Sequence, residues 1–213
     1  GSVNDRSTPF AELAAVAADV AATRSKLAKR ERLAGYLRGL PSTDLGTAVA
    51  FFAGRPLRDA TAKLGMGWVQ QGAALSAAAG VDAEALRAAY LRHSDLGDAA
   101  ADLLTGRSSG GLSVADVGEA FERMASAAAN DERVALLRGL FARSSAEEAR
   151  FLGRISSRET RIGLREGLLE EAVATAFDAP LEDVRRAHML TGDLGEAASL
   201  ARDGRLQRAA LHV

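Results

Sequence analysis

The most unusual stretch of the sequence is a run of arginines and small residues, RISSRETRIGLREG, at positions 154–167. Arginine binds phosphate oxygens through paired N–H donors, and serine and threonine hydroxyls add neutral donors. Glycine at a boundary between helices lets backbone amides approach such a ligand closely. The segment thus has the groups that hold a nucleic-acid backbone, and its candidate contacts are Arg154, Ser156, Ser157, Arg158, Thr160, Arg161, Gly163 and Arg165.

Two further segments have a similar character. The stretch GRPLRDATAKLG at 54–65 also places cations ahead of a glycine, and its candidates are Arg55, Arg58, Lys63 and Gly65. Residues 23–38 carry six cations and one acid, with Arg24, Lys26 and Lys29 as the candidates. A charged stripe on a helix is ordinarily a solvated face with Glu–Arg pairs, and this alternative stays open for each segment.

Few other residues could perform chemistry. The absence of Cys excludes disulfides, thiolate zinc sites and a Cys nucleophile. The three His residues lack metal-ligand spacing, and no phosphate-binding loop or Lys-x-Asp-Gly sequence occurs. Aromatic residues are too few for a platform that stacks single-stranded bases, and we interpret Trp68 as a core residue. We therefore expect neither catalysis, a metal nor a cofactor in this fragment.

The composition is that of a globular protein, with 47% hydrophobic and 26% charged residues in a chain of 213. No apolar run approaches the roughly 20 residues that span a bilayer. We expect a monomer in the cytoplasm with no membrane partner. The opening Gly-Ser pair resembles a tag remnant, so residues 1–8 are assigned to that remnant and an N-terminal tail.

Helical periodicity dominates the chain, and no run of alternating β-branched residues is present. The class is therefore all-α, with about a dozen short helices. Ser145 and Glu148 have the spacing of a capping box. The tripeptide Asp-(Leu/Val)-Gly, which begins at Asp44, Asp95, Asp116 and Asp193, predicts helix N-caps.

Internal matches indicate a duplication. YLRGL at 36–40 resembles LLRGL at 136–140, and FAGR at 52–55 resembles FLGR at 151–154. KLG at 63–65 and LRHSDLGDAA at 91–100 each have a counterpart 98 residues later. We expect two similar halves, 20–107 and 122–205, with a Gly- and Ser-rich linker at 105–113 and packing about a pseudo-two-fold axis. The backbones of duplex DNA are also related by local two-fold axes.

Several of these segments together resemble one known family. EARFLGRISSRETRIGLREGLLEEAVATAF (148–177) is similar to the most characteristic stretch of the N-terminal DNA-binding domain of ATP-dependent DNA ligases. TRSKLAKRERLAGYL (23–37), FFAGRPLRDATAKLGMGW (51–68) and MLTGDLGEAA (189–198) resemble other parts of that domain. The resemblance extends from Phe10 to Arg208 and is greatest for bacterial, actinobacterial-type members.

The resemblance implies a single non-catalytic DNA-binding domain at 9–208, with 209–213 starting the linker to absent catalytic domains. It also implies that the domain grips the minor groove of nicked duplex DNA without sequence specificity, in a nucleoid-associated enzyme. ATP and Mg²⁺ would act only in the full-length parent, whose nucleotidyltransferase and OB-fold domains are further partners. Arg158 departs from the family pattern, which has Gly there.

Two other functions remain open from the residues. A helical-repeat scaffold for protein partners fits the near-neutral charge of −1 equally well. A helical DNA-repair glycosylase would need a base-flipping pocket and a catalytic acid, and no distinctive candidate is present.

Overall fold

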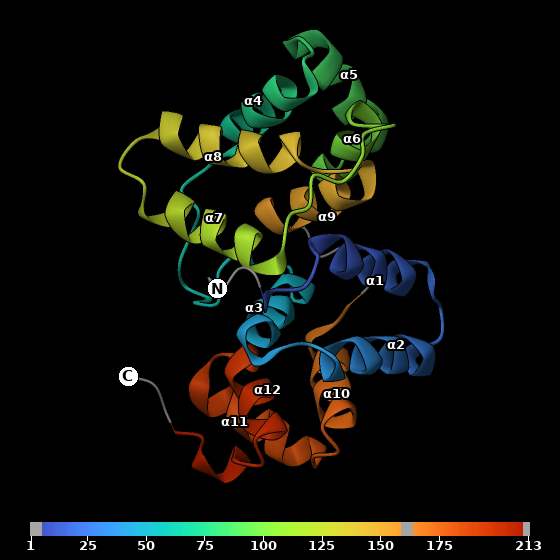
Figure 1. Ribbon diagram of the computed structural model, residues 1–213, viewed down its shortest axis with the longest axis vertical. Coiled ribbons are helices and arrows are strands. Elements are labelled where there is room, and N and C mark those ends of the chain that lie inside the picture. Colours follow the sequence, from blue (N-terminus) through green and yellow to red (C-terminus); the bar gives the residue numbers. More distant parts are fainter. Residues whose placement is uncertain (1–5, 159–163, 211–213) are drawn as a thin grey trace.

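The computed structural model describes residues 6–158 and 164–210, and in that part of the chain its regular elements are helices (Figure 1). Its helices are α1 (Phe10–Ala22), α2 (Lys26–Arg38), α3 (Ser42–Phe52), α4 (Trp68–Ala79), α5 (Ala83–His93), α6 (Leu96–Leu103), α7 (Val114–Ser126), α8 (Asn130–Ala142), α9 (Ala146–Ser156), α10 (Glu166–Ala176), α11 (Leu181–Thr191), α12 (Leu194–Arg202) and the 3₁₀ helix η2 (Leu206–Arg208). The predicted all-α class with a dozen helices is confirmed. Within the described residues, no helix has the length and apolarity to cross a bilayer.

The helices form two lobes (Figure 1). One lobe is the continuous run α4–α9, drawn in green and yellow, where α4 packs on α8 and α6 packs on α9. The other combines the two ends of the chain, drawn in blue and red, where α2 packs on α10 and α3 packs on α12. The chain therefore passes from one lobe to the other twice, through residues 53–67 and 157–165, which we call the first and second crossovers.

The helix bounds repeat along the chain. Helices α1, α2 and α3 each begin 104 residues before α7, α8 and α9, and α4, α5 and α6 each begin 98 residues before α10, α11 and α12. The offset changes because the second crossover is six residues shorter than the first. The repeated unit thus begins at α1 and at α7, earlier than the positions 20 and 122 that the sequence matches indicated.

Two of the four sequence matches do not align in the structure. Gly39 follows the end of α2 whereas Gly139 lies inside α8, and Gly54 follows α3 whereas Gly153 lies inside α9. The match of residues 91–100 with 189–198 does agree with the helix bounds, whereas the counterpart of KLG at 161–163 lies outside the described residues. Short segments that contain Leu and Gly recur in helical sequences without lying at equivalent structural positions.

An approximate two-fold relation is visible where the two repeats meet. The amide of Phe10 donates to the Leu112 carbonyl at 2.9 Å, and the amide of Val114 donates to the Thr8 carbonyl at 2.9 Å. These two bonds are exchanged by a shift of 104 residues. Accordingly α3 packs on α7 as α9 packs on α1.

Segments assigned to the tail and the linker belong to this junction. The buried carboxylate of Asp44 accepts hydrogen bonds from Ser7 Oγ at 2.7 Å and from the Thr8 amide at 2.7 Å. In the linker, Leu112 is buried and the Gly110 amide donates to the Arg143 carbonyl at 2.7 Å. Ser7, Thr8 and the end of the linker are therefore parts of the folded domain.

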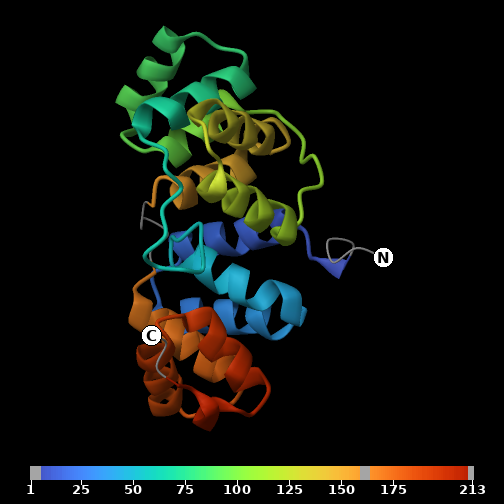
Figure 2. The same cartoon turned by 90° about the vertical axis from the view of Figure 1, so that its left-hand side faces the viewer.

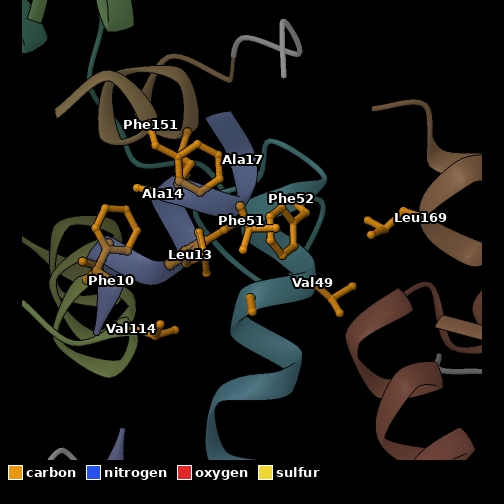
Figure 3. Packing of buried hydrophobic residues seen from close by; sticks show 14 of the residues in the cluster. Phe10, Leu13, Ala14, Ala17, Val49, Phe51, Phe52, Val114, Phe151 and Leu169 are labelled. Carbon is orange, nitrogen blue, oxygen red and sulfur yellow. The ribbon is translucent and has the colours of Figure 1, made fainter. Parts of the chain in front are cut away.

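Phenylalanines fill the centre of the molecule between the lobes (Figure 3). Phe10 on α1 stacks on Phe151 of α9 with ring centroids 5.9 Å apart and meets Phe51 of α3 edge-on at 6.2 Å. The ring centroid of Phe52, the last residue of α3, lies 6.2 Å from that of Phe151. Aromatic pairs in these geometries add about 0.5–1.5 kcal/mol each beyond the area that they bury. The ends of α3 and α9, where both crossovers begin, are thus fixed to one core.

In two of the Asp-Leu-Gly tripeptides the Asp is a helix N-cap, and both lie where two helices cross closely. Asp95 accepts from the Asp98 amide at 3.1 Å, and Asp193 accepts from the Glu196 amide at 3.2 Å. The glycine of each tripeptide faces the partner helix: a Cβ atom at Gly97 would lie 2.5 Å from the Arg150 carbonyl oxygen, and one at Gly195 would lie 2.8 Å from the Gly46 carbonyl oxygen. The predicted caps at Asp44 and Asp116 are wrong, because both residues occupy the third helical position instead.

A residue with left-handed backbone lies two positions after the last residue of both α3 and α9. Gly54 has φ 76°, and Arg158, which is 104 residues later, has φ 57°. Their amides complete the helix ends: that of Gly54 donates to Phe51 and that of Arg158 to Ile155. The backbone N–H of Arg158 is therefore used within the protein, and the departure from Gly at this position places an arginine in a strained conformation.

We predict that Gly97→Ala and Gly195→Ala each lower the free energy of unfolding by about 1–3 kcal/mol, because each added methyl group meets backbone atoms that cannot rotate away. Gly139→Ala is the control, since it lies on an exposed position of α8 with no atom within 4 Å of its Cβ. It should stabilise the helix by about 0.5–1 kcal/mol. Urea denaturation measures all three, and unchanged stability of Gly97→Ala would contradict this packing.

We also predict that Arg158→Gly raises the free energy of unfolding by about 1 kcal/mol, because glycine adopts a positive φ without steric cost. Arg165→Gly is the comparison, since Arg165 has an extended backbone with φ −91° and gains nothing from glycine. Thermal unfolding of both variants checks this. Equal effects of the two substitutions would show that the left-handed backbone of Arg158 carries no strain.

Candidate nucleic-acid interface

The first crossover and the described ends of the second, residues 157–158 and 164–165, lie together on one side of the molecule, between the lobes (Figure 2). Gln71, in the first turn of α4, donates through Nε2 to the Ser156 carbonyl at 3.3 Å and accepts from Ser156 Oγ at 3.3 Å. A hollow of about 360 Å³ lies at this contact and is lined by residues of both crossovers, among them Lys63, Gly65, Ser157 and Arg158. Two segments that lie about 100 residues apart in sequence thus form one surface.

A second hollow of about 320 Å³ adjoins the first, and Arg158 lines both. Its walls come from Phe52 to Arg55 at the end of α3, and from Leu164, Arg165 and Leu169 at the start of α10. The two linings together hold four cations, Arg55, Lys63, Arg158 and Arg165. None of the described residues that line them is an Asp or Glu, so the described lining carries a net positive charge. We call this surface the crossover surface.

Contacts before and after Lys63 in the sequence fix the conformation of the turn that presents it. Gly65 has φ 78°, and Leu64 beside it is buried. Asp59 precedes the turn and accepts from the amide and the hydroxyl of Thr61 at 2.9 and 2.7 Å. These hydrogen bonds hold the pKa of the Asp59 carboxyl below its usual range. Lys63 itself is exposed.

One helix N-terminus lies at the end of each crossover. Helix α4 begins after Gly67 and α10 begins after Arg165, and neither residue caps its helix with a side chain. The uncapped amides of a helix N-terminus, together with the helix dipole, favour an anionic ligand. The two N-termini are related by the offset of 98 residues, so the crossover surface has the same feature on each side of the pseudo-two-fold axis.

Several of the predicted arginines form ion pairs with carboxylates of the same chain. Arg154 has a side chain only 14% exposed, and its guanidinium donates to Asp98 at 2.9 Å. Arg150 also donates to Asp98, so both arginines connect α9 to α6. Arg58 donates to Asp193 at 2.9 Å, across to α12. The arginines at 150, 154, 158 and 165 do not form one stripe on a single helix, because α9 ends at Ser156.

The predicted serine hydroxyl donors also form hydrogen bonds within the chain. Ser156 is buried against Gln71, and Ser157 Oγ donates to the Gly153 carbonyl at 2.6 Å. Arg24 and Lys26 are exposed at the start of α2, where Ser25 caps the helix, while Lys29 is half-buried and has an interaction within the protein. None of these three lines either hollow. Thr160, Arg161 and Gly163 lie outside the described residues.

Sequence reasoning missed two residues near this surface. Gln71 connects the first crossover to the end of α9, because its Nε2 donates to the carbonyls of Met66 and Ser156, and an isolated Gln in a helix gives no signal for that role. Trp68 was interpreted as a core residue, and this is wrong: it is 46% exposed and lies against Tyr90 with ring centroids 4.1 Å apart.

The other titratable groups form ordinary pairs. His188 lies 2.9 Å from Glu170, and His93 lies 3.0 Å from Asp102, which also accepts from Arg92 at 2.8 Å. Hydrogen bonds from Arg92 and His93 hold the pKa of Asp102 below its usual range. Among the described residues no group of three or more His, Asp or Glu side chains is arranged to hold a metal ion.

Comparison with known proteins gives a consistent assignment. Residues 9–174 match the family model described as DNA ligase N terminus. The chain is 38% identical to a "Probable DNA ligase" of Opitutus terrae over 241 residues, covering 96% of this chain and 24% of that protein. It is 37% identical to a "Probable DNA ligase" of Pseudarthrobacter chlorophenolicus, covering 87% of this chain and 31% of that protein.

An archaeal relative is also similar. A "DNA ligase" of Methanothrix thermoacetophila is 32% identical over 218 residues, covering 97% of this chain and 39% of that protein. The resemblance therefore extends beyond bacterial members, and the chain spans between about a quarter and two fifths of the length of these three relatives. The matched residues and the all-helical fold identify the chain as a member of the DNA ligase N terminus family, the N-terminal domain of ATP-dependent DNA ligases.

Proposed function

We propose that this domain binds the backbone of nicked duplex DNA without sequence specificity and holds it for sealing by the rest of the ligase. The observation that carries the proposal is the meeting of both crossovers in one cationic surface. The surface has cations and helix N-termini, and none of the described helices bears a cluster of Asn, Gln and Arg for base readout. These features favour contact with phosphates rather than with bases.

Three cations are the proposed phosphate contacts: Lys63, Arg158 and Arg165. All three are exposed, and none forms an ion pair with a residue that the structure describes. This distinguishes them from Arg154 and Arg58, whose charges are neutralised by Asp98 and Asp193. A cation without an acid partner keeps its full charge for a polyanion and releases condensed counterions when it binds.

The pseudo-two-fold relation supports contact with both strands. The crossovers supply Lys63 from one repeat and Arg158 and Arg165 from the other. The backbones of a duplex are antiparallel and face each other across the minor groove, which is about 6 Å wide. A surface with equivalent anion-binding features on each side of its own axis matches that arrangement.

The chemistry of sealing would belong to the remainder of the protein. No Lys-x-Asp-Gly sequence occurs in these 213 residues, and the relatives are longer by a factor of about two and a half to four. We propose that the fragment is non-catalytic and monomeric, and that the adenylation and OB domains, ATP and Mg²⁺ act in the full-length enzyme. A nucleoid-associated, cytoplasmic location follows from the proposed substrate.

We predict that the chain binds nicked and intact duplexes with an affinity that falls as salt rises, with a log–log slope of about −0.9 per phosphate contacted. Lys63→Ala and Arg165→Ala should each weaken binding equally for all sequences and reduce the slope by about 0.9. Both residues are exposed, so neither change should alter stability. Fluorescence anisotropy of labelled duplexes at several salt concentrations measures this.

Arg186→Ala is the matched control, because Arg186 is exposed on α11 and lines neither hollow. It should leave the affinity and the salt slope unchanged. The same loss for Arg186→Ala as for Lys63→Ala would contradict the assignment of the crossover surface. A gel shift at low salt with no binding to either duplex would favour a protein-interaction scaffold instead.

A further inference from the structure

An apolar patch is exposed on α4 and α5, outside the cationic hollows. Val69 is 75% exposed, Leu91 is 74% exposed and Trp68 is 46% exposed. Together with Leu86 and Tyr90 they line a hollow of about 500 Å³ between the two helices. Single exposed apolar residues are common, but a contiguous group of this kind marks a site of interaction.

The patch is ordered by an aromatic contact that formation of helix α4 does not require. Trp68 packs on Tyr90 with centroids 4.1 Å apart and planes inclined at 45°, which fixes the indole at the start of α4. The equivalent positions at the start of α10, 98 residues later, are occupied by Glu166 and Gly167. The pseudo-symmetric half of the molecule forms the same helix without an aromatic side chain, so helix formation does not account for Trp68.

The patch lies close to the crossover surface. Trp68 lies three residues after Gly65, so their Cα atoms are at most about 11 Å apart. In the first turn of α4, Gln71 lines the cationic hollow while Trp68 and Val69 line the apolar one. The charged residue in the apolar lining is Arg87, which has the sign that suits a polyanion. These features favour DNA as the occupant over a protein surface.

We propose that the Trp68 patch (Trp68, Val69, Leu86, Tyr90 and Leu91) is a second, apolar part of the DNA-binding surface. This inference rests on the proposed function and extends the DNA-binding surface beyond the cations. The patch contacts deoxyribose faces and base edges beside the phosphates that Lys63 holds, as apolar side chains do in minor grooves. It acts on one side of the pseudo-two-fold axis only, because α10 has no counterpart. The domain therefore binds the symmetric duplex backbone with an asymmetric set of contacts.

Trp68 is the only tryptophan of the chain, so its emission reports on the patch directly. Binding is measured separately, by anisotropy of a labelled nicked duplex. The emission of Trp68 should change with the same dissociation constant, and acrylamide should quench it less in the complex. Binding with unchanged emission and unchanged quenching would overturn this inference and leave the proposed function intact. No binding at all, even at low salt, would overturn both.

A matched pair of substitutions tests the one-sided contact. Leu91 on α5 and Met189 on α11 are equivalent positions 98 residues apart, and each is 74% exposed. Leu91→Ala should weaken binding about threefold or more, and Trp68→Ala roughly tenfold, whereas Met189→Ala should have no effect. The salt slope should stay unchanged in all three, because no cation is removed.

Equal losses for Leu91→Ala and Met189→Ala would overturn the one-sided contact. A second copy of the chain is the other occupant to test. If Trp68 emission changed with protein concentration in the absence of DNA, the patch would be a self-association surface and the inference would be wrong.

Discussion

The structure depends on one constraint, which is that neither repeat buries all of its apolar helix faces within itself. Helices α2 and α3 pack on α10 and α12, and α8 and α9 pack on α4 and α6. The chain must therefore pass between the lobes twice, and both passages start from helices held in the same phenylalanine core. Because the repeats are related by an approximate two-fold axis, the crossovers meet beside it. The juxtaposition of two cationic segments is thus a consequence of packing rather than of their own sequences.

The same packing decides which cations are available. Arg154 and Arg150 are drawn to Asp98 where α9 crosses α6, at the place where Gly97 lets the two backbones approach. These arginines contribute to the contact between helices. Arg158 and Arg165 lie beyond the end of α9, where no described acid pairs with them. One run of arginines in the sequence is therefore divided at Ser156 into a part that stabilises the fold and a part that faces solvent.

Much of the fold could be predicted from the sequence, because helical periodicity and capping residues act locally. The all-α class, the caps at Asp95 and Asp193 and the capping box of Ser145 and Glu148 are confirmed. The repeat register was wrong before the crossovers, since a six-residue difference in length lies in segments with no helical pattern. The roles of Arg154 and Ser156 could not be predicted, because their partners Asp98 and Gln71 lie 56 and 85 residues away. The exposure of Trp68 likewise depends on how α5 packs beside α4.

The proposed contact of one crossover surface with both strands of a duplex can be measured by hydroxyl-radical footprinting of the chain on a nicked duplex, read separately on each strand. We expect a protected tract on both strands facing each other across one minor groove, and the protection should weaken on both when Lys63 and Arg165 are replaced by Ala. Protection confined to a single strand, or unchanged by these substitutions, would contradict it.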